Sequence, residues 1–390
     1  MKPLDAASIL PEDGTAGTLV GRLWLPSVSG PSVVAVRRGG VFDVTSAFPT
    51  VSALAEQPDP AGALRDVAGT LIASLHDIVA NTPPDGRDPG KPWLLAPLDL
   101  QVLKAAGVTF VVSMLERVIE ERARGNPSSA AAIRQEVVRL VGDDLSKLKP
   151  GSPEAMHLKK VLIAQQAWSQ YLEVGIGPDA EVFTKAPVLS SVGTGMDAGL
   201  HPKSTWNNPE PEVVLVVSSS GRIVGATLGN DVNLRDFEGR SALLLSKAKD
   251  NNASCAVGPF LRLFDETFSL DDVRKMDLAM TVRGDDGFVL EGHSSISKIS
   301  RDPEDLVSQT VGPEHQYPDG FALFLGTMFA PVKDRDVPGQ GFTHKRNDIV
   351  TIQAAKLGKL INRMRPSDEC EAWTFGIGAL MMSLAGRRLG

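Results

Sequence analysis

NNPEPEVVLVV, residues 207–217, places two glutamates one residue apart at the start of an apolar run. Such β-branched runs favour a buried strand. Residues i and i+2 of a strand project from the same face, about 7 Å apart at their Cα atoms. Glu210 and Glu212 would therefore stand side by side, and their like charges would repel. Either the pair belongs to a solvated face at a strand end, or a positive partner binds both carboxylates.

A second strand is expected to return toward these glutamates. SSSG, residues 218–221, has the composition of a turn, and the β-branched stretch after it completes a hairpin that brings Asp231 back to the start of the first strand. Three converging carboxylates suit a hard, six-coordinate cation, Mg²⁺ or else Mn²⁺ or Ca²⁺, whereas zinc favours His and Cys. Beside the solvated-face interpretation, the sequence thus predicts a metal site at Glu210, Glu212 and Asp231.

Length, charge and cysteine content restrict the class of protein. The 390 residues, 42% of them hydrophobic, can bury a large core and suggest two or three domains. A net charge of −7 disfavours nucleic acid and anionic membranes, which attract clustered Lys and Arg. The two cysteines cannot build a disulfide framework, and no apolar segment is typical of a signal peptide or a membrane span. We expect a cytoplasmic globular protein with neither a nucleic-acid nor a membrane partner.

Composition changes along the chain predict its domains. Residues 81–92, rich in Pro, Gly and Asp, are the clearest linker, so we expect a small α+β domain over 1–92 and a larger domain over 93–390. In the small domain we expect short strands around a Gly-Gly turn and one helix that carries the apolar stripe of residues 64–78. Helical patterns between turn-forming segments predict a helical insertion at about 127–172. From residue 182 on, β-branched runs predict a mainly β body.

Three consecutive blocks of the sequence resemble the core of the fumarylacetoacetate hydrolase family. They are the opening stretch 207–217, LGNDVNLRDFEG at 228–239 and KAKDNNASCAVGPF at 247–260. FTKAP, LFLGT and HKRNDIV resemble later family blocks, so the likeness runs from about residue 107 to the C-terminus. It implies an α+β fold with a mainly β catalytic body, a mixed β-sandwich roll.

The resemblance also implies roles for individual residues. The family's metal ligands fall on Glu210, Glu212 and Asp231, with Mg²⁺ as the expected ion and Mn²⁺ as the second choice. Arg235 and Lys249 match its arginine and its active-site lysine; with the metal they would balance the carboxylates and attract an anionic 2-oxo acid. Without the resemblance, Lys249 would be read as a surface lysine. The substrate-binding residues that the resemblance implies are Ser113, Lys185, Thr327 and His344.

The helix expected at residues 110–124 separates two branches of that family. Hydrolases of the family activate a water with a His–Glu dyad, but this stretch has no histidine. Ser113, Arg117 and Glu120 instead resemble the Ser-x-x-x-Arg-x-x-Glu helix of the sugar-acid dehydratase branch, whose members are also long. Arg117 and Glu120 share a helix face, where the arginine would keep Glu120 ionised. An ordinary surface salt pair is the alternative.

The dehydratase branch implies a metal-dependent lyase. Its substrate would be a 2-keto-3-deoxy-D-pentonate derived from D-xylonate or D-arabinonate, and its product 2-oxoglutarate semialdehyde (2,5-dioxopentanoate), in pentose catabolism. We expect Lys249 to act as base or enolate clamp and Glu120, oriented by Arg117, to transfer a proton on the far side. A hydrolase that cleaves a carbon–carbon bond of a diketo acid and a non-enzymatic sugar-acid-binding protein are the alternatives. Because family members usually pair through their β bodies, we expect a homodimer or a dimer of dimers.

Overall fold

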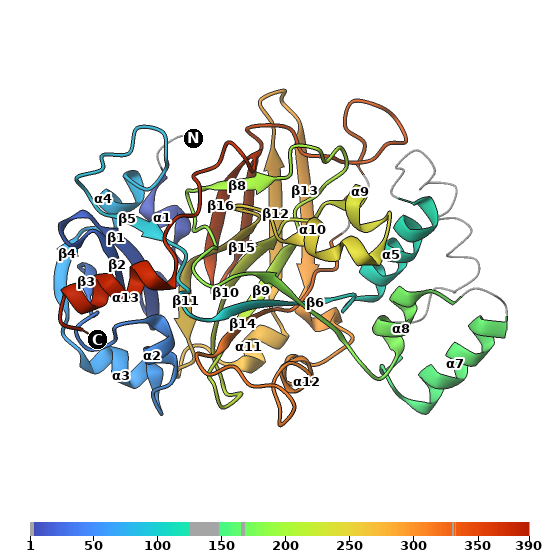
Figure 1. Cartoon of the computed structure of the whole chain (residues 1–390), viewed down its shortest axis with the longest axis horizontal. Helices are drawn as coiled ribbons and strands as arrows, with labels where there is room; N and C mark the ends of the chain where they lie inside the picture. Colours follow the sequence, from blue (N-terminus) through green and yellow to red (C-terminus); the bar gives the residue numbers. More distant parts are fainter. Residues whose placement is uncertain (1–3, 125–147, 165–167, 330, 332, 390) are drawn as a thin grey trace.

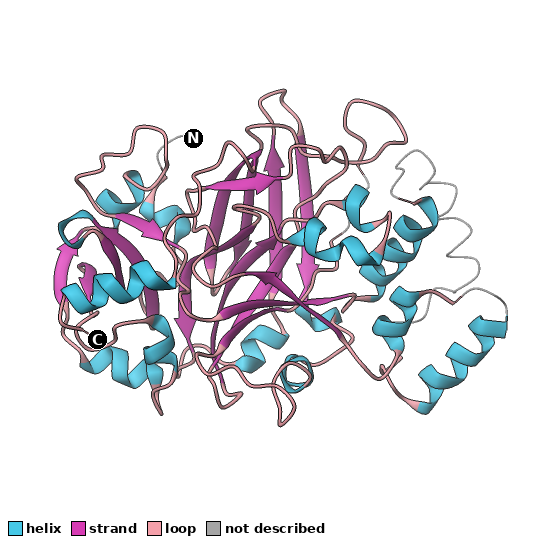
Figure 2. Cartoon of the chain, in the orientation of Figure 1, coloured by secondary structure: helices cyan, strands magenta, loops and turns pink. Residues whose placement is uncertain are grey.

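The computed structural model describes residues 4–124, 148–164, 168–329, 331 and 333–389, without the side chains of residues 112, 113 and 120. This part of the chain has a mixed α/β fold built on two mixed β-sheets, with a small unit at one end and a group of helices at the other (Figure 1, Figure 2). No helix among the described residues is both long enough and apolar enough to cross a membrane.

The N-terminal unit contains the expected short strands, together with several short helices in place of the one helix expected. Its elements are α1 (Ala6–Ile9), β1 (Leu19–Leu25), η1 (Pro26–Val28), β2 (Gly30–Arg37), β3 (Gly40–Asp43), α2 (Val51–Ala55), α3 (Pro60–Asp66), β4 (Thr70–Ala73), α4 (Leu75–Ala80) and β5 (Trp93–Leu95). The C-terminal helix α13 (Ile377–Gly386) packs against this unit at β2 (Figure 1).

The prediction of a single helix over residues 64–78 is wrong. Helix α3 ends at Asp66, and after residues 67–69 the chain forms β4, which pairs antiparallel with β3. Gly69 lies between them at φ = +72°, and a Cβ there would lie 3.0 Å from the Asp43 carbonyl oxygen. The extended backbone of Val67 (φ −85°, ψ 121°) ends α3, and Gly69 adds a left-handed residue before β4. The pairing of β4 with β3 then overrides the helical periodicity of the apolar residues.

The larger sheet runs through both expected domains. Its order is β4-β3-β2-β1-β11-β10-β9-β14-β6-β7, with β5 paired to β1, and the β14–β6 pair is parallel. Strands from both sides of residue 92 therefore share one sheet, and the domain boundary at that residue stays a prediction. The strands not yet given bounds are β6 (Val102–Gly107), β7 (Glu181–Ala186), β9 (Pro211–Val217), β10 (Ile223–Asp231), β11 (Cys255–Leu263) and β14 (Phe321–Phe324).

The smaller sheet has the order β13-β12-β15-β16-β8. Its strands are β8 (Asp197–Leu200), β12 (Asp277–Arg283), β13 (Val289–Ser295), β15 (Ile349–Ala354) and β16 (Gly358–Pro366). Val213 and Leu215 of β9 share a core with Met280 of β12, whereas Val214 packs in a second core that includes Leu54 of α2. Strand β9 is thus buried on both faces, which explains its unbroken apolar run.

Helices cover the end of the β body that carries the candidate site (Figure 1). Helices α5 and α8 pack together in a core that includes Val118 and Leu172. Much of the expected insertion at 127–172 lies outside the described residues. The remaining helices are α5 (Val111–Ala123), α7 (Pro153–Ala164), α8 (Gln170–Ile176), α9 (Arg235–Glu238), η3 (Ala242–Leu244), α10 (Leu245–Lys249), α11 (Leu270–Arg274), η4 (Ile296–Lys298) and α12 (Pro303–Ser308).

Candidate active site

The β9–β10 hairpin brings three carboxylates together. Glu210 immediately precedes β9, Glu212 lies opposite Gly229 of β10, and the Asp231 amide donates to the Glu210 carbonyl oxygen at 3.1 Å. One oxygen of each carboxylate of Glu210, Glu212 and Asp231 lies within 4.8 Å of the others. The predicted hairpin is confirmed. The solvated-face interpretation is wrong, because Glu210 and Glu212 are only 5% and 2% exposed.

Three basic side chains of the protein compensate this cluster. The Nζ of Lys249 lies 2.5 Å from Oε2 of Glu210 and 2.8 Å from Oδ2 of Asp231. On the other side of Asp231, Lys185 Nζ lies 2.9 Å from Oδ1, and Arg117 Nη2 lies 2.5 Å from Oε1 of Glu210. These cations come from α10, β7 and α5, so separate elements must pack correctly to complete the site.

Burial and neighbouring charges shift the pKa values of the cluster in different directions. Burial raises the pKa of Glu212 well above its ordinary value, and the Asp231 and Glu210 charges raise it further. Burial alone would also raise the pKa of Asp231, but Lys185 and Lys249 hold it below its ordinary value. For Lys249, burial opposes the charged form, yet the Asp231 and Glu210 carboxylates raise its pKa. Among the three carboxylates, Glu212 is thus the one whose charge the protein compensates least.

The three carboxylates fit a hard divalent cation. They offer oxygen ligands alone, as Mg²⁺ and Mn²⁺ prefer, and the described group includes neither histidine nor cysteine. The cavity around them is about 40 Å³ in volume, room for an ion or a few waters. Among the residues that line it are Arg117, Glu181, Asn208, Arg235, Glu238, Lys249, Thr327 and Phe329.

Arg235 forms a charged wall of the cavity. Its guanidinium lies over the Trp206 ring, 4.4 Å from the ring centroid, and its Nη1 donates to the Pro331 carbonyl oxygen at 3.3 Å. Its Nη2 lies 3.6 Å from Oε2 of Glu116, which also lines the cavity. The stacking and these contacts fix a buried positive charge close to the carboxylate cluster.

Glu181 is a site residue that the sequence interpretation missed. It opens β7 opposite Gly107 of β6 and lines the cavity, and within the described residues its carboxylate has no hydrogen-bond or ion-pair partner. Burial raises its pKa, although Arg117 and Lys249 act in the opposite direction. Glu181 stands four residues before Lys185 in one strand, a spacing that in a regular strand places both side chains on the same face, although the register with β6 shifts at Lys185. This spacing from Lys185 is the sequence feature that could have identified Glu181 as a site residue.

The other predicted site residues fall into three groups. Arg117, Arg235, Lys249 and Thr327 line the cavity with the carboxylates. Lys185 lies behind the cavity, fully buried against Asp231, and His344 also lies outside the cavity-lining residues, with its ring on Asp348. The side chains of Ser113 and Glu120, on α5, lie outside the described residues, as does any pairing of Glu120 with Arg117. Arg117 does contact Glu238, with Nη1 3.0 Å from Oε2.

Known proteins similar to this chain are sugar-acid dehydratases. No protein-family model matches the chain. It is 30% identical over 185 residues to 2-dehydro-3-deoxy-D-arabinonate dehydratase of Saccharolobus solfataricus, covering 47% of this chain and 58% of the relative. It is 30% identical over 192 residues to a Haloferax volcanii protein named as a probable 2-keto-3-deoxyxylonate dehydratase, covering 49% and 62%. The match thus spans about six tenths of the length of each relative.

Solved structures show the same fold. The hexagonal crystal form of 2-keto-3-deoxyarabinonate dehydratase has a TM-score of 0.61 at 21% identity and covers 89% of this chain and 99% of that one. The 2-keto-3-deoxy-D-arabinonate dehydratase complex with magnesium and 2,5-dioxopentanoate has a TM-score of 0.59 at the same identity and coverage. A Mycobacterium smegmatis 5-carboxymethyl-2-hydroxymuconate delta-isomerase has 0.51 at 16% identity, covering 89% and 98%. The resemblance to the fumarylacetoacetate hydrolase fold family is confirmed.

Gly326 holds Glu212 in place, and this predicts a specific effect of substitution. The Gly326 amide donates to Oε2 of Glu212 at 2.7 Å, φ is +86°, and a Cβ there would lie 2.0 Å from Oγ1 of Thr109. We expect Gly326→Ala to lower the free energy of unfolding by about 1–3 kcal/mol, from left-handed strain alone, with the clash adding to it. Urea unfolding followed by circular dichroism measures this loss.

A matched control separates strain from loss of the Glu212 contact. Gly339 has a similar φ of +81°, but a Cβ there would meet no atom within 4 Å. Gly339→Ala should therefore show the strain cost alone and bind Mn²⁺ as the parent protein does, whereas Gly326→Ala should lose more stability and bind Mn²⁺ more weakly. Equal losses of stability and equal Mn²⁺ affinities in the two variants would contradict this role of Gly326.

The raised pKa of Glu181 predicts a pH-dependent effect on stability. A carboxyl whose pKa is higher in the folded state favours folding below its unfolded pKa of about 4.5, and this contribution is lost as pH rises through the folded value. Glu181→Gln should therefore raise the Tm of the EDTA-treated protein at pH 7, and the gain should shrink toward pH 4.5. Scanning calorimetry across this range measures it, with the exposed Glu291→Gln as control. A lower Tm at pH 7 would contradict the assignment.

Proposed function

We propose that this chain, a member of the fumarylacetoacetate hydrolase fold family, is a Mg²⁺-dependent hydro-lyase. It would dehydrate a 2-keto-3-deoxy-D-pentonate to 2-oxoglutarate semialdehyde (2,5-dioxopentanoate) in pentose catabolism. The observation that carries the proposal is the buried cluster of Glu210, Glu212 and Asp231 with Lys249 against it. Its support comes from the dehydratase relatives and from the similar fold solved with magnesium and 2,5-dioxopentanoate.

The carboxylate cluster would hold the ion. Glu210, Glu212 and Asp231 provide an all-oxygen ligand set suited to Mg²⁺, with Mn²⁺ as the second choice. When bound, the ion supplies Lewis-acid polarisation of the substrate's 2-oxo group. Arg235, fixed over Trp206, would bind the substrate carboxylate, and the Thr327 hydroxyl would bind close to it.

Dehydration needs one group that moves a proton and one that stabilises negative charge. The C3–H electron pair forms the C2–C3 double bond of an enol, which then expels the C4 hydroxyl as water; the resulting 5-hydroxy-3-ene tautomerises to the aldehyde. The carboxylates keep Lys249 charged, so its ammonium suits the negative charge that develops on the 2-oxo oxygen. Glu181, with its raised pKa, suits removal of the C3 proton. Glu120, oriented by Arg117, stays our candidate for proton transfer at the C4 hydroxyl.

Hydrolysis of a carbon–carbon bond in a diketo acid is the alternative. That reaction would require a base that activates a water, and the family hydrolases use a histidine for it. The residues that line the cavity in the described part of the chain include no histidine. This composition favours the dehydratase over the hydrolase.

Substrate consumption tests the function. The protein incubated with Mg²⁺ should consume a 2-keto-3-deoxy-D-pentonate with formation of an aldehyde, and it should leave acylpyruvates intact. EDTA should abolish the reaction, Mg²⁺ or Mn²⁺ should restore it, and Glu212→Gln should fold but lose the metal. Consumption of diketo acids alone would show a hydrolase. Full activity of Glu212→Gln would contradict the metal site.

Hydrogen exchange separates the two proton-transfer roles. In deuterated buffer, the parent protein should exchange the C3 hydrogens of the substrate, and NMR follows this exchange. We expect Glu181→Gln to abolish exchange, because it cannot accept the proton, while Glu120→Gln should retain exchange but lose aldehyde formation. If Lys249→Met abolishes exchange and Glu181→Gln retains it, then Lys249 is the base. Parent rates in all three variants would contradict every one of these roles.

The assembly and location of the protein remain predictions. The expected homodimer or dimer of dimers would give two or four chain masses in light scattering, and one chain mass would contradict it. The cytoplasm is likewise an expectation from the sequence.

A further inference from the structure

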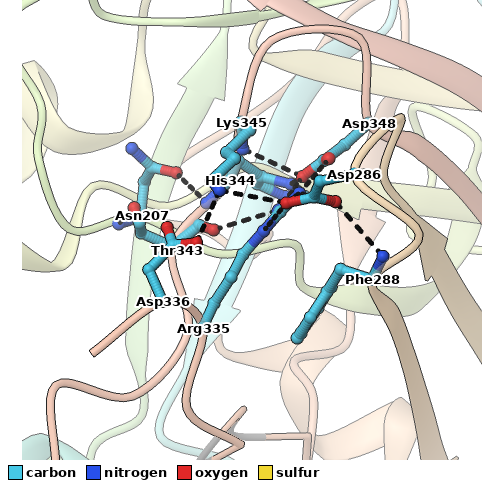
Figure 3. Close-up of polar contacts among 9 residues, drawn as sticks. All are labelled: Asn207, Asp286, Phe288, Arg335, Asp336, Thr343, His344, Lys345 and Asp348. Carbon is cyan, nitrogen blue, oxygen red and sulfur yellow. Dashed lines mark hydrogen bonds and ion pairs between the residues drawn. The ribbon is translucent and has the colours of Figure 1, made fainter. Parts of the chain in front are cut away.

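A buried ionic network lies outside the cavity-lining residues and centres on Asp348 (Figure 3). The fully buried Asp348 carboxylate accepts hydrogen bonds from Arg335 Nη1 at 2.6 Å and Nη2 at 2.9 Å. It lies 3.0 Å from Nδ1 of His344, and the Lys345 amide donates to it at 2.9 Å. Charge-assisted bonds of this kind, buried away from water, fix the geometry of the segment that carries them.

The contact with Asp348 determines which ring nitrogen of His344 carries a hydrogen. Its Nδ1 must carry the hydrogen, because Asp348 can only accept, and the ring packs edge-on against Phe342 with 4.9 Å between centroids. Its Nε2 is buried and has no hydrogen-bond partner within the described residues. Burial lowers the pKa of His344 despite Asp348, in keeping with a neutral ring. The His344 ring is thus held by Asp348, and His344 is not among the residues that line the cavity.

The oriented segment binds the start of the metal-site strand. The His344 amide donates to Oδ1 of Asn207 at 3.1 Å, and the Asn207 amide donates to Oγ1 of Thr343 at 3.4 Å (Figure 3). The next residue, Asn208, exchanges two backbone hydrogen bonds with Asn233, at 3.0 and 3.1 Å. Asn207 thus joins the Asp348 network to the hairpin end that carries the carboxylates.

The chain between Asn207 and Glu210 is stiff enough to transmit position. Pro209 and Pro211 flank Glu210, and each proline ring fixes its own φ. The Glu210 amide donates to Oδ1 of Asn230 at 3.0 Å, and its carbonyl oxygen accepts from the Asp231 amide. Few backbone torsions between Asn207 and Glu210 can change freely, so a displacement of Asn207 should also displace Glu210.

We propose that Asp348 and His344 are positioning residues, which act through Asn207 to set Glu210 and the start of the β9–β10 hairpin for metal binding. This inference rests on the proposed function only in its use of the metal site. It gives His344 a role different from the direct substrate contact that the sequence suggested. Groups that orient metal ligands from behind commonly change metal affinity by tenfold or more when they are lost.

Two variants and one matched control test the proposal. Asp348→Asn removes one of the two carboxylate charges on Arg335, the other being Asp286. Asn207→Ala removes the acceptor of the His344 amide, together with the Asn207 Nδ2 donor to Oγ of Ser204 at 3.1 Å, and leaves the ionic network intact. The control is Asp197→Asn in the smaller sheet. Asp197 is bound by the buried Arg363 in the same two-point manner, at 2.7 and 3.0 Å, and it lies outside the cavity-lining residues.

Two readouts, neither of which needs substrate, decide the outcome. Hydrogen–deuterium exchange of the metal-free protein reports on the amides of Asp231 and Asn233, whose acceptors are the carbonyl oxygens of Glu210 and Asn208. Titration of the metal-free protein with Mn²⁺ gives the affinity. We expect Asn207→Ala and Asp348→Asn to speed exchange locally and to weaken Mn²⁺ binding by about tenfold, with Asp197→Asn like the parent.

Each result supports the proposal or overturns it. If Asn207→Ala matches Asp197→Asn in both readouts, the proposal is overturned. Asn207→Ala decides the outcome in this way even if Asp348→Asn fails to fold. If the parent protein binds no Mn²⁺, the metal part of the proposed function fails. The local exchange of Asp231 and Asn233 then decides the positioning role by itself.

Discussion

The burial of three carboxylates within 4.8 Å of one another is the constraint on which the rest of this structure depends. Buried charges of one sign are costly unless partners of the other sign meet them with good geometry. Here the partners Lys185, Lys249 and Arg117 arrive from β7, α10 and α5. The hairpin alone therefore cannot make the site; a strand at the sheet edge and two helices must dock before the carboxylates are tolerated.

The sheet around the hairpin gives this cluster its rigidity. Both faces of β9 are covered, one by the smaller sheet and the other by the small N-terminal helices and their neighbours. Two backbone amides add to this rigidity: the Gly326 amide donates to the Glu212 carboxylate, and the Asp231 amide donates to the carbonyl oxygen of Glu210, just before β9. The ligands thus lie on or next to two almost completely buried strands, β9 and β10, where a displacement would disturb packing on two sides.

Local patterns in the sequence predicted the hairpin and its carboxylates, because a turn between two β-branched runs determines which residues meet. The helix expected over residues 64–78 failed for a reason outside its apolar periodicity: Gly69 takes a left-handed conformation, and β4 pairs with β3. Glu181 could have been predicted as a site residue from the sequence, because it precedes Lys185 by four residues, twice the two-residue period of a strand. The contact between Asn207 and His344 joins residues 137 positions apart, and no local pattern reports on such a pair.

The division of charge within the site bears on its chemistry. Lys249 sits between two carboxylates that favour its charged form, whereas Glu181 faces the same cavity without a partner in the described chain, and burial favours its neutral form. When their environments favour different protonation states, neighbouring titratable groups suit different catalytic roles. A lysine held charged can stabilise an anion but has no lone pair to take a proton. A carboxyl with a raised pKa is a stronger base than an ordinary one, so in the proposed reaction the proton transfer would fall to Glu181 and the charge stabilisation to Lys249.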